Sequence, residues 1–228
     1  MRTPTAQELL ILLLFALFLL SGCTSMGRHS ESTLEAIDFG ESQKVRFCVY
    51  LDEGITEHRA MQLLADAWSE EGMKYGIHIE PVSFREWKRP AFFMGDILGE
   101  LTKNKLESPC DRKLAFLGRG FTDFAASFVT FEILGAVNDQ SLTHGYVFAE
   151  IASLNQWLVP PVEATRHEIY HLLGCGEHND MEACYAKIAL MKQLRRSNED
   201  DFYPAWDLEN NSLLPTRLSV NQRLGLVQ

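Results

Sequence analysis

Two histidines placed four residues apart constrain this chain more than any other feature of its sequence. His167 and His171 enclose the triplet Glu-Ile-Tyr. Pro161 and Glu163 precede them at positions that suit the first turn of a helix. In a helix, residues four apart lie on one face, about one turn from each other. Both imidazoles can therefore reach one tetrahedral Zn²⁺ ion at about 2.0–2.1 Å, so the stretch predicts a helix that carries two metal ligands.

Glu168 follows the first histidine and can face a water molecule on the metal. Zinc lowers the pKa of such a water towards about 7, and a carboxylate can accept its proton and pass it to a leaving amine. The motif therefore predicts zinc-dependent peptide-bond hydrolysis with Glu168 as the catalytic base. The alternative is an ordinary amphipathic helix with two solvated or buried histidines, because short matches to this pattern occur by chance.

Gly174 stands three residues after His171, where the motif helix is expected to end. Glycine adopts the left-handed conformation without a steric cost and turns the chain sharply, which can bring a third ligand back to the metal. With the two histidines, Glu168 and Gly174, the sequence resembles the metzincin metallopeptidases, whose pattern is His-Glu-x-x-His-x-x-Gly-x-x-His followed by a Met-turn. The resemblance is specific over residues 160–195 and implies a zinc endopeptidase that cleaves protein or peptide substrates.

The third ligand departs from the metzincin pattern by one position. Glu177 occupies the expected position and His178 follows it. A neutral imidazole is the commoner third ligand in the resembled family, so we expect His178 to bind, with a Glu177 oxygen as the alternative. A third option is Glu199, because residues 198–201 loosely resemble the second helix motif of thermolysin-like peptidases. Tyr203 is a candidate transition-state donor, a role that a tyrosine has in some metzincins.

Met191 ends the run Ile-Ala-Leu-Met, which resembles the Met-turn of the matrix metalloproteases. The resemblance implies that its side chain forms an apolar floor under the zinc site. The alternative is ordinary core, which is common for a methionine in an apolar run, and Met181 is the competing residue. The resemblance also implies an edge strand near residues 146–150 that pairs with extended substrate through backbone hydrogen bonds. A core strand is the alternative there.

The N-terminus has the pattern of a targeting segment. Arg2 precedes an unbroken apolar run at residues 9–20, which is too short for a comfortable membrane span and has the length of a secretory signal core. The following Leu-Ser-Gly-Cys resembles the lipobox of bacterial lipoproteins, which implies cleavage before Cys23 and lipid on its thiol. An ordinary signal peptide or a short anchor helix is the alternative. Thr24 stands where an Asp would resemble an inner-membrane retention signal. We therefore expect a lipid-anchored protein of the bacterial cell envelope, with a weak preference for the outer membrane.

Four cysteines remain besides Cys23, and an exported protein meets an oxidising compartment in which they can form two disulfides. Three pairings are open. The short loop favours Cys175 with Cys184, which would leave Cys48 with Cys110. A bridge between Cys175 and Cys184 would limit the movement of the third ligand and would be worth about 2–4 kcal/mol. Zinc ligation by one of these thiolates is the alternative.

Hydrophobic periodicity predicts an α+β fold. A polar tether at residues 23–43 separates the signal peptide, residues 1–22, from one peptidase domain at residues 44–228. The metzincin resemblance implies a mixed twisted sheet and a long N-terminal helix, with an active-site helix followed by a Met-turn and a C-terminal helix. Strands are predicted at residues 44–51, 77–84, 113–117 and 146–152, and helices from Thr56 to Gly72 or Gly76 and at 95–103, while residues 121–137 are ambiguous.

The formal net charge of −10 excludes some classes of function but does not identify one. Neutralising phosphates requires clustered Lys and Arg, so nucleic acid is not an expected partner. The expected partners are a protein or peptide substrate and, through the lipid, a membrane, and we expect a monomer. The rival function is a non-catalytic envelope lipoprotein. Its structural zinc site would be closed by Cys175, Cys184 or Glu177 in place of water.

Overall fold

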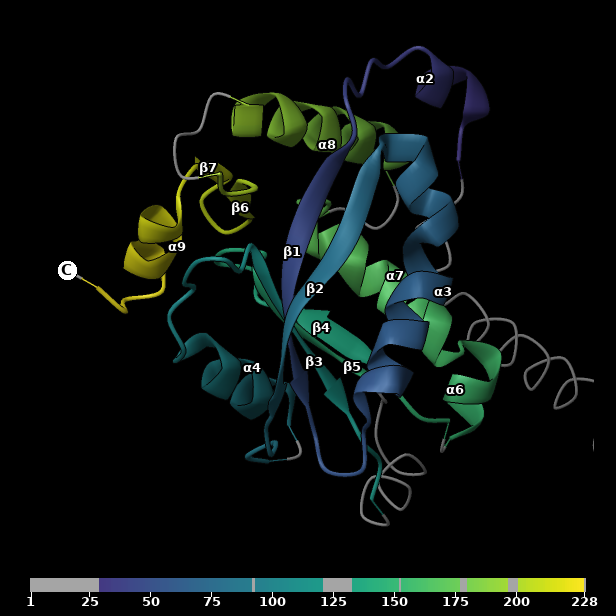
Figure 1. The fold of residues 1–228 in the computed structure, drawn as a ribbon, viewed down its shortest axis with the longest axis vertical. Helices are drawn as coiled ribbons and strands as arrows, with labels where there is room; N and C mark the ends of the chain where they lie inside the picture. The colour runs from purple at the N-terminus through teal and green to yellow at the C-terminus, as the bar shows by residue number, and fades with distance from the viewer. Residues whose placement is uncertain are drawn as a thin grey trace, which may run out of the picture.

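The described part of the chain folds around one mixed β-sheet. The computed structural model describes residues 29–91, 93–120, 133–151, 153–176, 180–196 and 201–227. Within these residues the fold is α+β, with seven helices, a five-stranded sheet and a small two-stranded sheet (Figure 1). The predicted fold class is confirmed at this level.

The five-stranded sheet has the strand order β2-β1-β3-β5-β4. Strands β1, β2, β3 and β5 run parallel, and β4 pairs antiparallel with β5. Because β5 lies between β3 and β4, the edge strand expected near residues 146–150 is instead a core strand, and β4 forms the edge. The strands are Gln43–Leu51 (β1), Ile77–Glu86 (β2), Arg112–Leu117 (β3), Gly135–Val137 (β4) and His144–Phe148 (β5), with Ala205–Asp207 (β6) and Ser212–Leu214 (β7) in the small sheet.

Helices cover both faces of the large sheet. Helices α3 and α7 pack together on one face, and α4 lies on the other (Figure 1). In β1, Val45, Phe47 and Val49 face the large core under α3 and α7, as the period of two in a strand requires. Cys48 and Tyr50 belong to the clusters on the opposite face. The helices are Glu31–Glu35 (α2), Glu57–Tyr75 (α3), Met94–Thr102 (α4), Leu154–Leu158 (α6), Pro161–Leu172 (α7), Met181–Arg196 (α8) and Arg217–Arg223 (α9).

The long helix α3 begins and ends where the sequence predicts. The Thr56 side chain accepts a hydrogen bond from the backbone N–H of Arg59 at 3.2 Å, which caps the first turn. Gly76 ends the helix in the left-handed conformation, with a φ of +58°. Local capping signals therefore suffice to place this helix.

The segment at residues 29–42 packs onto the domain, which differs from the polar tether predicted over residues 23–43. Leu34, Ile37 and Phe39 lie partly buried against the main core. Three large apolar side chains in a mostly polar stretch are enough to dock it, although they form no periodic pattern. The polar composition of the segment therefore does not make it a free linker.

Two disulfides form, and their pairing is the one that the short loop favours. Cys48 bonds to Cys110, and Cys175 bonds to Cys184. The first bridge joins β1 to the segment before β3, and the second joins the end of α7 to α8. Such bonds are compatible with a protein outside the cytoplasm. Within the described residues, none of the helices has the length and hydropathy of a membrane span.

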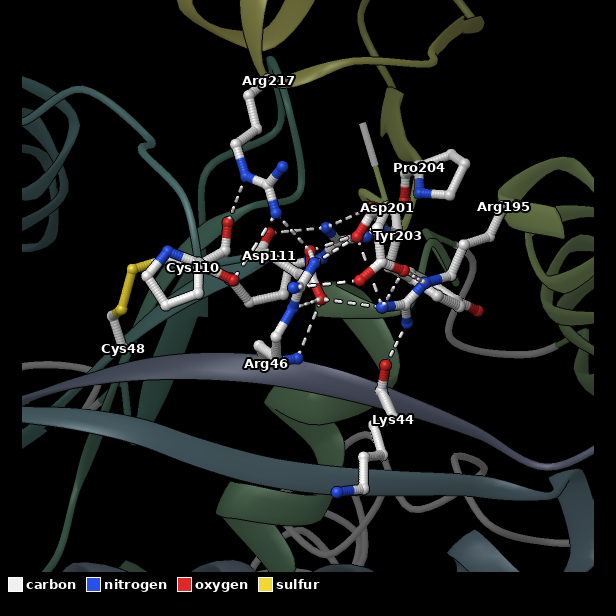
Figure 2. A network of polar contacts seen from close by, with 12 residues as sticks. Lys44, Arg46, Cys48, Cys110, Asp111, Arg195, Asp201, Tyr203, Pro204 and Arg217 are labelled. Atoms are coloured by element: carbon white, nitrogen blue, oxygen red, sulfur yellow. Dashed lines mark hydrogen bonds and ion pairs between the residues drawn. A yellow bond between two sulfur atoms is a disulfide. The ribbon is translucent and has the colours of Figure 1, made fainter. Parts of the chain in front are cut away.

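A buried aspartate gathers three arginines where the sheet, α8 and α9 meet. Asp111, directly before β3, is fully buried. Its carboxylate accepts hydrogen bonds from Arg46 and Arg217 at 2.9–3.1 Å (Figure 2). Arg195 of α8 lies 3.7 Å from the same carboxylate. One buried negative charge therefore ties β1, α8 and α9 to the start of β3.

Replacing this carboxylate should destabilise the fold strongly. Asp111→Asn leaves guanidinium groups without their buried counter-charge, which typically lowers the free energy of unfolding by about 3–5 kcal/mol. Asp201→Asn is the matched control, because Asp201 pairs with Arg46 and Arg195 through a side chain that is 69% exposed. It should cost less than about 1 kcal/mol. Urea unfolding of both variants measures the difference, and equal losses would contradict a special role for Asp111.

Candidate metal centre

The two motif histidines face each other on α7. The Nε2 atoms of His167 and His171 are 3.1 Å apart, and the ring centroids are 4.7 Å apart with the planes at 77°. Two nitrogen ligands at about 2.0–2.1 Å from a tetrahedral zinc ion are separated by roughly 3.3 Å. The observed separation is close to this value, so the pair fits one shared metal ion.

A backbone carbonyl fixes the orientation of His171. Its Nδ1 lies 2.7 Å from the carbonyl oxygen of Cys175. A carbonyl can only accept, so Nδ1 carries the hydrogen, and in the neutral form of the ring the lone pair is on Nε2, the atom nearest to His167. Metal-ligating histidines commonly donate their other N–H to an acceptor of this kind. The ring is therefore held in the tautomer that a metal ligand needs.

Gly174 forms the turn that brings this carbonyl back to the helix. Its φ is +103°, in the left-handed region that the sequence predicts for it. The backbone N–H of Gly174 donates to the carbonyl of His171 at 2.9 Å, and that of Cys175 donates to the carbonyl of Tyr170 at 3.0 Å. These two bonds are those of a Schellman helix end. The predicted glycine cap is confirmed, and it positions the acceptor for His171.

Glu168 is buried with one carboxylate oxygen unpartnered. The residue is 4% exposed, and its Oε2 has no hydrogen-bond partner among the described residues. Burial raises the pKa of the Glu168 carboxyl to about 8. The edge strand β4 leaves room for the side chain, because a Cβ at Gly135 would lie only 2.7 Å from Oε1 of Glu168. The sequence does not predict this role for Gly135, since a glycine in an ambiguous segment gives no sign of what it faces.

Met191 lies within α8 and not in a turn. The helix Met181–Arg196 contains no glycine or proline that would break it. The Met191 side chain is completely buried, and its Cε lies 3.3 Å from the point that a Cβ at Gly174 would occupy. A helix therefore replaces the predicted turn, and the thioether packs against the end of the motif helix. Met181, the competing residue, begins the same helix.

Other candidate residues do not join this site in the structure. Cys175 and Cys184 are bonded to each other, so neither offers a thiolate to a metal. Tyr203 is completely buried. Its hydroxyl oxygen is buried and has no hydrogen-bond partner among the described residues, so it is closed off from solvent. In the part of the chain that the structure describes, no group of three or more His, Cys, Asp and Glu side chains is placed to hold a metal ion. Four candidates lie outside the described residues: Cys23, Glu177, His178 and Glu199.

Known proteins offer little for comparison. No protein family matches the chain, and no curated protein matches it. One solved structure with some likeness is described as "Structure of a chaperone-substrate complex"; it is 13% identical with a TM-score of 0.44. The match covers 60% of this chain and 25% of that chain. A likeness at this level carries no conclusion about fold or function.

The metal-free protein should lose stability as the pH rises towards the pKa of about 8 for Glu168. Because the folded-state pKa is raised, the folded protein keeps a proton that the unfolded chain has released. The stabilisation that comes from protonated Glu168 is therefore fully present below the pKa of the unfolded state, and it is lost as the pH rises through about 8. The loss should reach a few kcal/mol.

The Glu168→Gln variant should lack this component, because its side chain does not ionise. Urea unfolding of both chelator-treated proteins at about pH 5 and about pH 9 measures the difference. The same pH dependence in the two proteins would show that Glu168 is not the buried ionising group.

Proposed function

We propose that this chain is a zinc-dependent peptidase in which His167, His171 and His178 hold the metal and Glu168 is the catalytic base. One observation carries the proposal. Two histidine nitrogens 3.1 Å apart share a helix with a buried carboxylate that has an unpartnered oxygen. A metal ligand pair beside a perturbed acid is a common arrangement of functional sites. His178 enters as the third ligand from the sequence pattern alone.

The chemistry then follows from the position of Glu168. A zinc ion bound here would polarise the scissile carbonyl and make the attacking water easier to deprotonate. With the metal bound, Glu168 would accept a proton from that water and deliver it to the departing amine. Burial raises the pKa of Glu168 to about 8, which makes its carboxylate a stronger base than an exposed glutamate. Near neutral pH the metal-free carboxyl is mostly protonated, and the charge of a bound zinc ion would favour the ionised form that accepts a proton.

An extended peptide is the substrate that suits the edge strand β4. Within the described residues β4 pairs on one side only, with β5, so its other edge is open for backbone hydrogen bonds. Gly135 of this strand also approaches Glu168 closely. A substrate strand added at this edge would therefore lie near the catalytic glutamate. This arrangement supports protein or peptide substrates over small molecules.

A structural zinc site remains the rival proposal, and the second disulfide weakens it. Cys175 and Cys184 are bonded to each other, so they cannot close a four-ligand site. Of the three residues that could close it, only Glu177 is left. The thermolysin-like alternative, with Glu199 as the third ligand, keeps the same reaction and differs in the metal site alone.

The proposed activity lies outside the cytoplasm, on a protein that the lipidated Cys23 holds at a membrane of the bacterial envelope. The two disulfides support an oxidising compartment. The lipobox-like sequence before Cys23 supports the anchor, and the outer membrane remains the preferred location. The substrate would then be a protein or peptide of the envelope or its surroundings.

The Glu168→Gln variant should lose peptide cleavage while keeping one zinc ion per chain. Removing a general base typically lowers the rate by about 10²–10⁴-fold. Glu163→Gln is the matched control, because Glu163 lies on the same helix with a 46% exposed side chain and should keep both properties. Metal analysis and cleavage of a peptide library test all three proteins. Activity that survives Glu168→Gln would exclude the mechanism.

Three single substitutions should identify the third ligand. We expect His178→Ala to weaken zinc binding by more than about 100-fold, which exceeds the usual effect of an outer-shell partner. Glu177→Ala and Glu199→Ala should leave zinc binding within about tenfold of the unaltered chain. Competition with a chromophoric chelator measures the affinities. Loss of zinc in the Glu199 variant alone would favour the thermolysin-like arrangement, and loss in the Glu177 variant would favour an oxygen ligand.

A further inference from the structure

A buried carboxylate on α3 links the motif helix to the N-terminal segment. Glu71 is 4% exposed, and its Oε2 accepts a hydrogen bond from the Tyr170 hydroxyl at 2.5 Å. The same oxygen lies 2.8 Å from Nε2 of His29. Tyr170 lies between Glu168 and His171 in the motif. His29, in the segment that precedes β1, and Tyr170, in the helix that carries the site, therefore contact the same oxygen of Glu71.

The contacts of His29 form a chain of donors and acceptors with one consistent direction. The backbone N–H of Ser30 donates to the Tyr185 hydroxyl oxygen at 3.2 Å. That oxygen lies 3.1 Å from Nδ1 of His29 and can donate its own hydrogen to it. Nε2 can then donate its hydrogen to the Glu71 carboxylate. Each polar group of this chain therefore has a partner.

Tyr170 connects this hydrogen-bond chain to the helix that carries the candidate metal site. Each residue of a helix is turned by about 100° from the one before it, so Tyr170 is turned by about 60° from His167 and about 100° from His171. The Tyr170 ring packs against Trp68, with the centroids 5.1 Å apart. Its hydroxyl also lies 3.1 Å from that of Tyr75. Holding Tyr170 from α3 therefore fixes the rotation of α7 about its own axis.

We propose that Glu71 and His29 are positioning residues for the motif helix, and that residues 29–39 form a clasp that completes their hydrogen-bond network. The clasp spans α3, α7 and α8 through Glu71, Tyr170 and Tyr185. Leu34 and Phe39 of the same segment pack against the main core. The metal-binding and activity consequences of the clasp rest on the proposed function, whereas its effect on α7 does not.

Variants of His29 in the full chain test the clasp. His29→Ala removes both ring contacts, and His29→Gln keeps a side-chain N–H that can still reach Glu71. His58→Ala is the matched control, because His58 is an exposed histidine of α3 outside the network. The measurements are hydrogen exchange of the α7 amides, zinc affinity by chelator competition, and kcat and KM on a cleaved peptide.

We expect His29→Ala to speed exchange at residues 166–172 by at least about tenfold. Zinc affinity and kcat should each fall by about tenfold with KM little changed, because the orientation of Glu168 matters most in the transition state. His29→Gln should recover most of each loss, and His58→Ala should show none.

Unchanged exchange in α7 would overturn the clasp. Faster exchange with unchanged zinc affinity and kcat would overturn its positioning role, and so would a His29→Gln variant as impaired as His29→Ala. An unaltered chain that binds no zinc would overturn the proposed function and, with it, the positioning of a metal site. The exchange measurement would then still decide whether residues 29–39 hold α7.

Discussion

A fully buried guanidinium is the constraint on which the surroundings of the motif helix depend. Arg112 has no solvent exposure, and burial lowers its pKa to about 10, which still leaves it charged at neutral pH. A buried charge is stable only where acceptors surround it. Arg112 donates to the backbone carbonyl of the adjacent Asp111 and to three carbonyls from distant segments. Those three belong to Leu172, Tyr203 and Pro204. These hydrogen bonds hold the end of α7 and the segment before β6 against the start of β3. The adjacent Asp111 supplies the negative charge there.

The motif helix is held at its end, at its side and by a neighbouring helix. Arg112 and the glycine cap fix its last turn, and the Glu71 carboxylate holds Tyr170 at its side. Met191 packs against the same end from α8. A site works only when its side chains are oriented before the ligand arrives, so the supporting contacts matter as much as the ligands. Here the support comes from three parts of the chain that are far apart in sequence.

The part of the site that could be predicted from the sequence depends on contacts within one or two helical turns. The facing histidines and the left-handed Gly174 are of this kind, because helix geometry alone places them. Met191 is different, since its apolar run suits a helix as well as a turn. One partner of Glu71 is His29, 42 residues away, and the glycine that faces Glu168 lies on strand β4. No local pattern indicates which side chains meet across such separations, so the clasp and the role of Gly135 follow only from the fold.

Two buried titratable groups show why a large pKa shift does not by itself identify a functional position. Burial lowers the pKa of His144 to about 3, but its ring nitrogens lie 2.8 Å from the Thr143 hydroxyl and 3.3 Å from the Asn104 carbonyl. His144 is therefore a neutral, satisfied core residue in spite of its large shift. Glu168 has a raised pKa and an oxygen without a partner among the described residues. An apolar residue would fill the same space without that cost. Uncompensated burial of this kind concentrates at functional sites, but the Tyr203 and Ser83 hydroxyls are also buried without a partner among the described residues, so an unpartnered oxygen alone does not identify a catalytic group.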